Sequence, residues 1–89
     1  MATLLVQQQV KDFAEWKKIY DSVAKERASR GGLSAQVYQD VDDPNHVTII
    51  GKWRSLDDAR KWADSPTLKA AVEKSGVESM PVFTFLNEA

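Results

Sequence analysis

Apolar side chains recur with two different spacings along the chain, and four short stretches carry the closer spacing. Leu33–Val41 alternates between apolar and polar residues over most of its length, and Thr3–Val10 is rich in branched aliphatic residues. His46–Trp53 and Met80–Leu86 are equally short and rich in β-branched or aromatic residues. Because successive side chains of a strand point to opposite faces, these four stretches are predicted to be β-strands.

The segment after the first strand has the wider spacing of an amphipathic helix. Asp12 suits the N-cap position, and Gly31 followed by Gly32 is typical of a helix C-terminus. Between these ends, aromatic and aliphatic residues recur three or four positions apart: Phe13, Trp16, Tyr20 and Val23. We therefore predict one helix between Asp12 and Gly31, packed on the core through this stripe.

A second helical segment follows the third strand and contains a break. Ser55 suits the N-cap of a helix that continues to about Ala63. Ser65 and Pro66 then suit a new start, because proline is favoured at the first position of a helix. Gly76 is the predicted end, and the apolar stripe of this second piece consists of Leu68, Ala71 and Val72.

The predicted order is strand, helix, strand, strand, helix, strand. This is the βαββαβ order of a ferredoxin-like α+β sandwich, in which both helical segments cover one face of an antiparallel sheet. Pro81 favours an edge position for the last strand or a place at its entrance, because proline cannot donate to the sheet ladder. Without a repeat or a linker, residues 1–89 are predicted to form a single domain.

The sheet face without helices is predicted to be apolar as well. His46–Ile50 and Met80–Leu86 carry apolar side chains on both of their faces. Burying a Val, Leu, Ile or Phe contributes about 1.5–3 kcal/mol, and a patch of several such residues seldom stays exposed on a monomer. We expect a homodimer in which the bare sheet faces or edges meet. The alternative is that the helices and the C-terminal residues fold over far enough to cover both faces.

The composition excludes several classes of function. The chain has 12 basic and 13 acidic side chains, one histidine and no cysteine. The resulting net charge of −1 gives no electrostatic footprint for nucleic acid or an anionic membrane, so neither is expected as a partner. One histidine without cysteine falls short of ordinary transition-metal ligation, so no metal site is expected. The sequence shows no secretory leader and no long apolar run, which favours a cytoplasmic protein.

Five residues are candidates for a functional site. His46 is the only side chain with an ordinary pKa near neutrality and is the first candidate acid or base, although a histidine at a strand entrance is often structural. Trp53 and Trp62 suit either the wall of an apolar pocket or the core. Tyr38 is a further pocket candidate, and its place on the polar side of its strand also suits the dimer face or solvent. Gly51, in mid-strand, indicates a bulge or a close approach that opens room for a ligand.

The stretch Trp53–Val77 reads WRSLDDARKWADSPTLKAAVEKSGV. It places a tryptophan at a strand end, then a serine, an alanine on the next helix, a Ser-Pro break and a second helical piece. This pattern and the order of elements resemble the antibiotic biosynthesis monooxygenase-like (ABM) family of the dimeric α+β barrel superfamily. The resemblance implies a dimeric α+β barrel. Cofactor-independent oxygenases of phenolic or quinol polyketides, haem-degrading enzymes and isomerases belong to this superfamily.

Two branches of the superfamily permit a comparison residue by residue. The haem-degrading branch uses an Asn on the first strand, a Trp in the second helical region and a His ten residues after that Trp. Trp62 matches the Trp, but Val72 stands at the His position, and the first strand offers Gln7, Gln8 and Gln9 instead of Asn. The resemblance therefore disfavours haem degradation. The oxygenase branch commonly has a His at the position of Trp62, where this chain also departs.

The resemblance implies a cofactor-independent monooxygenase-like enzyme acting on a small aromatic or enolisable molecule, with His46 and Trp62 as catalytic candidates and a pocket formed by Trp53, Trp62 and Tyr38. In such oxygenases the electron-rich substrate anion passes an electron to O2 itself, and the protein supplies a dry, orienting pocket. No cofactor is therefore expected. The alternative is a non-catalytic ligand-binding or dimerisation module of the same fold. A cavity of roughly 300 Å³ or more with converging polar groups favours the enzyme.

Overall fold

The computed structural model describes residues 1–76 and 79–89. Val77, the last residue of the stretch compared above, and Glu78 lie outside the described residues. None of the described helices has the length and apolar composition that crossing a bilayer requires. The elements in chain order are β1 (Ala2–Gln9), α1 (Phe13–Ser22), α2 (Ala24–Ser29), β2 (Gly32–Gln39), β3 (His46–Trp53), α3 (Leu56–Ala63), α4 (Pro66–Lys74) and β4 (Val82–Leu86).

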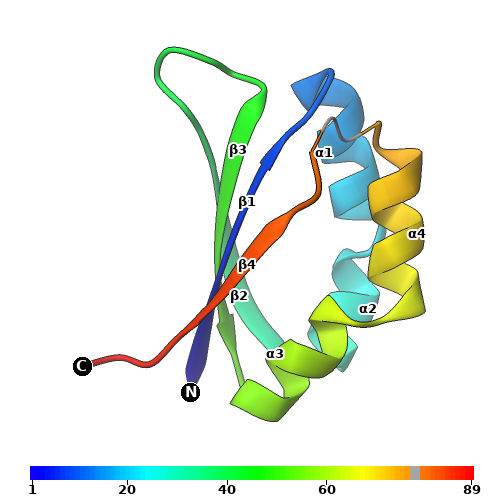
Figure 1. Ribbon diagram of the computed structural model, residues 1–89. Helices are drawn as coiled ribbons and strands as arrows, with labels where there is room; N and C mark the ends of the chain where they lie inside the picture. Colours follow the sequence, from blue (N-terminus) through cyan, green and yellow to red (C-terminus); the bar gives the residue numbers. More distant parts are fainter. Residues whose placement is uncertain (77–78) are drawn as a thin grey trace.

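The strands form one antiparallel sheet in the order β2-β3-β1-β4. All helices lie on one side of this sheet, and its other side carries no element of the described chain (Figure 1). The predicted α+β sandwich with one-sided helices is therefore confirmed. β4 is an edge strand and begins directly after Pro81, which agrees with the position predicted from this proline.

The helix predicted between Asp12 and Gly31 is two helices, α1 and α2. Val23 separates them with φ −104° and ψ 11°, and its N–H donates to the carbonyl of Tyr20 at 3.4 Å, three residues earlier. The prediction of a single helix is therefore wrong. Val23 packs against the buried core. Because the sheet is twisted, a bend at this point keeps both short helices close to it.

The second strand ends earlier than the alternation of residues predicts. β2 stops at Gln39, and Val41 is 98% exposed in the turn that follows, so its predicted place on the inward face is wrong. The side chain of Asp40 accepts a hydrogen bond from the N–H of Asp42 at 2.9 Å. Such local bonds compete with the sheet ladder and begin a turn. The predicted turn before His46 is confirmed.

The predicted helix N-caps are confirmed by their hydrogen bonds. The carboxylate of Asp12 accepts from the N–H of Glu15 at 3.2 Å. The hydroxyls of Ser55 and Ser65 each accept from the N–H three residues later at 3.1 Å. Each cap satisfies an N–H that has no partner within its helix. Ser65 also lies in the break between α3 and α4.

Two buried clusters fill the layer between sheet and helices. The larger consists of Leu4, Val6, Trp53, Ala59 and Trp62, and the smaller consists of Val10, Trp16 and Val47. The inward faces of β1 and β3 supply half of these residues, in the period of two expected for a half-buried sheet. The clusters leave space between them and the helices, and this space forms the candidate site.

Candidate functional site

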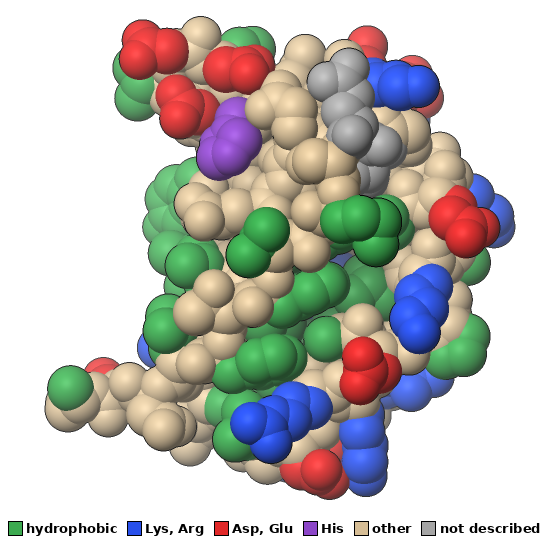
Figure 2. Space-filling model, in the orientation of Figure 1, with side chains coloured by type: hydrophobic (Ala, Val, Ile, Leu, Met, Phe, Trp, Pro, Cys, Tyr) green, Lys and Arg blue, Asp and Glu red, His purple; other side chains and the backbone are tan. Residues whose placement is uncertain are grey.

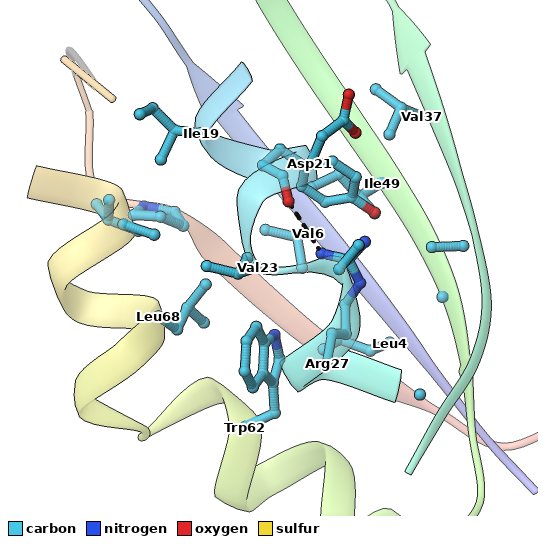
Figure 3. Close-up of a pocket in the computed structure, with 18 of the residues that line it drawn as sticks. Leu4, Val6, Ile19, Asp21, Val23, Arg27, Val37, Ile49, Trp62 and Leu68 are labelled. Atoms are coloured by element: carbon cyan, nitrogen blue, oxygen red, sulfur yellow. Dashed lines mark hydrogen bonds between the residues drawn. The ribbon is translucent and has the colours of Figure 1, made fainter. Parts of the chain in front are cut away.

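A cavity of about 580 Å³ lies between the inner face of the sheet and the helices. Figure 3 shows Leu4, Val6 and Ile49 on the sheet side of this cavity, and opposite them Val23, between α1 and α2, and Leu68, on α4. Its volume falls within the range of about 300–1,000 Å³ typical of small-molecule pockets. It also meets the size criterion set above for an enzyme. We call this space the cavity.

Small residues create the cavity. Long side chains at these positions would fill the layer between sheet and helices. The lining instead has alanine or glycine at Ala24, Ala28, Gly32, Ala35, Gly51 and Ala71. Over the edge strand β2 the helical cover is thin, because α2 is only six residues long. As a result Leu33, on the cavity side of β2, is 55% exposed. The cavity is therefore open toward solvent near this edge of the sheet.

The two tryptophans predicted for the pocket meet in the structure. Trp53 ends β3 and Trp62 lies in α3, with ring centroids 6.0 Å apart and ring planes tilted by 32°. Both are nearly fully buried, and both line the cavity. The break after α3 holds Trp62 in place, since its carbonyl accepts from the Ser65 hydroxyl at 2.8 Å. Each indole thus serves the core and the cavity wall together.

Gly51 marks a close approach and not a bulge. A Cβ at this position would lie 3.3 Å from Nε1 of Trp53, so a side chain would press against the indole. The irregularity of the sheet lies instead on the partner strand, between Gly32 and Ser34. The expectation of a close approach is confirmed, and the alternative expectation of a bulge at Gly51 is wrong.

Two polar groups lie in the cavity lining without a hydrogen-bond partner among the described residues. Gln8 is only 6% exposed, and its Oε1 has no donor. The hydroxyl of Tyr20 is likewise buried and unpaired. Buried polar atoms in folded proteins almost always have partners. These two groups therefore add unpaired polar atoms to the lining, where they can orient a ligand.

Tyr20 lies in a stack of flat side chains along α1 and α2. Its ring centroid is 5.0 Å from that of Trp16, and the Arg27 guanidinium lies 4.1 Å from the Tyr20 ring centroid. Burial raises the pKa of Tyr20, while the nearby Arg27 and Lys17 charges lower it by less. The hydroxyl therefore stays protonated at neutral pH and is available as a hydrogen-bond donor.

Three charged side chains also line the cavity. Lys17 and Asp21 form an ion pair at 2.7 Å on the exposed side of α1. Figure 3 shows Arg27 reaching into the cavity, where its Nη1 donates to the Tyr20 carbonyl at 3.4 Å. Within the described ranges Arg27 forms no ion pair. Its charge is thus available to a ligand oxygen.

The structure does not bring the other predicted site residues to the cavity. His46 opens β3 beside the acidic β2–β3 turn, with Nδ1 4.0 Å from a carboxylate oxygen of Asp40 (Figure 2). Tyr38 is 47% exposed, and its hydroxyl donates to Gln36 at 2.7 Å. Neither belongs to the described lining. Over residues 1–76 and 79–89 no group of three or more His, Cys, Asp or Glu could hold a metal ion.

Sequence reasoning missed Gln8, Tyr20 and Arg27 as site residues. Gln8 falls on the same face of its strand as Leu4 and Val6, so a glutamine at an inward position was a readable signal. The sequence places Tyr20 in the apolar stripe of the helix. Its ring does pack there, but its hydroxyl lies in the cavity lining. Arg27 follows Tyr20 by seven residues, a spacing that returns to the same helix face and survives the bend at Val23.

Comparisons with known proteins agree with the geometry. The sequence model of the family described as antibiotic biosynthesis monooxygenase matches residues 6–74. No match was found among curated proteins. A crystal structure of an antibiotic biosynthesis monooxygenase superposes with a TM-score of 0.80 at 13% identity, covering 100% of this chain and 99% of that one.

Two further solved structures share the fold. SnoaB, a cofactor-independent oxygenase from Streptomyces nogalater, superposes with a TM-score of 0.81 at 16% identity over 99% of this chain and 92% of its own. A conserved protein from Methanosarcina mazei Go1 gives a TM-score of 0.79 at 16% identity, with 99% and 92% covered. At these identities the structural likeness shows the fold, and the family assignment rests on the sequence model.

Proposed function

Because the chain belongs to the antibiotic biosynthesis monooxygenase family, we propose that it is a cofactor-independent monooxygenase acting on a small aromatic or enolisable molecule. The cavity of about 580 Å³, walled by Trp53 and Trp62 and containing unpaired buried polar groups, is the observation that carries this proposal. SnoaB supports it as a cofactor-independent oxygenase with the same fold.

The proposed reaction oxidises an activated methylene group of the substrate with O2. The substrate loses a proton, and the resulting anion passes an electron to O2, after which a carbon–oxygen bond forms. One oxygen atom stays on the substrate, and the other leaves as water with the two hydrogens of the methylene group. The methylene carbon thereby becomes a carbonyl carbon, and O2 is the oxidant. The chain contributes an apolar cavity, ring contacts from Trp53 and Trp62, and a hydrogen-bond donor at Tyr20.

Oxygen uptake with an anthrone-class substrate tests the proposal. We expect protein-dependent O2 consumption with formation of the corresponding quinone. Ala71→Phe should abolish it by filling the cavity, whereas Ala70→Phe, on the neighbouring exposed position of α4, should leave it unchanged. Failure of a broad panel of anthrones and quinols to support uptake contradicts the proposal, as does equal activity of the two variants.

The catalytic role predicted for His46 is tested in the same assay. Its side chain is 38% exposed and lies outside the described lining of the cavity. We propose that Trp62 acts as a wall of the site and that His46 is not its acid or base. His46→Gln should therefore retain most of the oxygen uptake, and a loss of more than about tenfold would restore His46 as the acid or base.

A second candidate function is a ligand-binding module without catalysis. One observation favours it: the cavity lining contains no histidine in the described chain, and Lys17 and Asp21 are paired with each other. A general base with a pKa near neutrality is thus not evident in the cavity. Tight binding of a hydroxylated aromatic without any oxygen uptake selects this module over the enzyme.

We also propose that the working form is a homodimer joined through the bare sheet face. Several apolar residues on the outer side of the sheet remain accessible, among them Tyr38 at 47%, Val82 at 61% and Leu86 at 41%. Leu5 lies opposite Ile50 at the centre of this face. Clusters of this kind seldom stay open to water. Sedimentation should give a dimer for the native chain and a monomer for Leu5→Lys, and a stable native monomer at high micromolar concentration contradicts the proposal.

A further inference from the structure

Gln8 and Tyr20 are polar where packing alone would favour apolar residues. Oε1 of Gln8 and the hydroxyl of Tyr20 are buried, line the cavity and have no hydrogen-bond partner in the described chain. Burying such groups without partners lowers the stability of a fold. Glu26 also has a buried oxygen without a hydrogen bond, but its carboxylate lies 3.6 Å from Arg30 and does not line the cavity.

The two groups lie toward the same end of the cavity. Gln8 pairs across the sheet with Val47, and Tyr20 packs against the buried cluster that contains Val47. Trp53 is at the opposite end of β3, paired with Ala2. The cavity thus has Trp53 and Trp62 at one end, and Gln8 and Tyr20, with Trp16 stacked on Tyr20, at the other.

We propose that Gln8 and Tyr20 select a ligand by its hydroxyl group. The occupant is an aromatic molecule whose ring system packs near Trp53 and Trp62 and whose phenolic hydroxyl donates to Oε1 of Gln8, while Tyr20 donates to the oxygen of that same hydroxyl. This inference rests on the proposed function and adds the chemical group of the substrate that the site recognises, a phenolic hydroxyl. It also assigns the two residues as specificity determinants.

Water in the empty cavity does not remove this selection. Water molecules that hydrogen-bond Gln8 and Tyr20 would be displaced when a ligand enters. A ligand that replaces their hydrogen bonds retains affinity, whereas one without a hydroxyl leaves both groups unpaired in an apolar surrounding. The difference in affinity between two otherwise matched ligands is expected to be about 10- to 100-fold.

Binding of a matched pair of unreactive ligands tests the inference. The probes are 2-hydroxyanthraquinone and 2-methoxyanthraquinone, titrated against the full chain while tryptophan fluorescence is recorded. The wild-type protein should bind the hydroxy compound at least tenfold more tightly. Gln8→Leu and Tyr20→Phe should bring this ratio close to one. Tyr38→Phe, which removes a hydroxyl outside the cavity, is the matched control and should keep the wild-type ratio.

Thermal unfolding of the empty variants separates recognition from a structural role. If the two groups are kept for a ligand, Gln8→Leu and Tyr20→Phe should unfold at or above the wild-type temperature, because each removes an unpaired buried group. A fall in the unfolding temperature of both variants overturns the inference. So does a ratio that stays at the wild-type value in both, or the failure of the wild-type chain to bind either probe.

The proposed reaction and this inference fail in different ways. Selective binding of the hydroxy compound without oxygen uptake supports the inference and refutes the oxygenase. Oxygen uptake without any preference for the hydroxyl refutes the inference and leaves the oxygenase standing.

Discussion

Gly31→Ala is expected to destabilise the fold because two independent features of this position require glycine. Gly31 has φ +112°, a conformation that residues with a side chain rarely adopt. A Cβ there would also lie 2.6 Å from Oδ2 of Asp58. That carboxylate is paired with the Arg54 guanidinium at 2.8 Å, and its side chain is only 19% exposed. A methyl group at Gly31 would have to displace this pair.

The size of the effect follows from these two features. A non-glycine residue in a sparsely populated backbone region costs about 1–3 kcal/mol. Displacing the half-exposed Arg54–Asp58 pair adds up to about 1 kcal/mol. The loss for Gly31→Ala is therefore about 1–4 kcal/mol. At about 4–8 °C per kcal/mol for a domain of this size, the unfolding temperature should fall by roughly 5–30 °C.

Gly76→Ala is the matched control. Gly76 also has a positive φ, +67°, but this value lies in the left-handed helical region, and the nearest side-chain atom to its added Cβ is Lys11 Cδ at 3.7 Å. Its loss should be about 1 kcal/mol. Thermal unfolding followed by circular dichroism measures both variants. If Gly31→Ala is no more destabilising than Gly76→Ala, the clash with Asp58 does not govern this turn.

Three further changes test other parts of the structure. Trp62→Ala should lower the free energy of unfolding by about 3–5 kcal/mol in urea titrations, since the buried indole packs on Trp53. Burial raises the pKa of Tyr20, so the unfolded chain loses this proton first above about pH 10, and stability should fall with rising pH less steeply in Tyr20→Phe. The Asn45 N–H and the Gln9 amide lower the pKa of Asp43, so stability is lost as pH falls through its folded pKa, and Asp43→Asn should flatten that acid limb.

Much of the fold was predictable because local residue patterns and tertiary packing favour the same elements. The alternation in β2, the branched residues of β1 and β3 and the caps at Ser55 and Ser65 predicted these elements, because each feature reports one local cause. The bend at Val23 was not predictable in this way. Valine fits the helical stripe, and the break depends on how the two short helices pack on a twisted sheet.

The candidate site was only half predictable for a different reason. Trp53 and Trp62 lie close together, as the predicted pocket requires, and the helix break beside Trp62 is the feature that favours a cleft there. The alternation of β2 places Tyr38 on the polar face of its strand, and the structure finds it there, away from the cavity. A polar residue on a strand is usually exposed, so the sequence does not predict the burial of Gln8, which depends on the helices that cover β1.

Nuclear magnetic resonance on the isotope-labelled chain tests the central claim that the cavity is the ligand site. Titration with 2-hydroxyanthraquinone should shift the indole N–H signals of Trp53 and Trp62 and the backbone signal of Gln8, while Tyr38 and Gln36 on the opposite face of the sheet stay in place. Shifts confined to the opposite face, with both indole signals unmoved, would contradict the account.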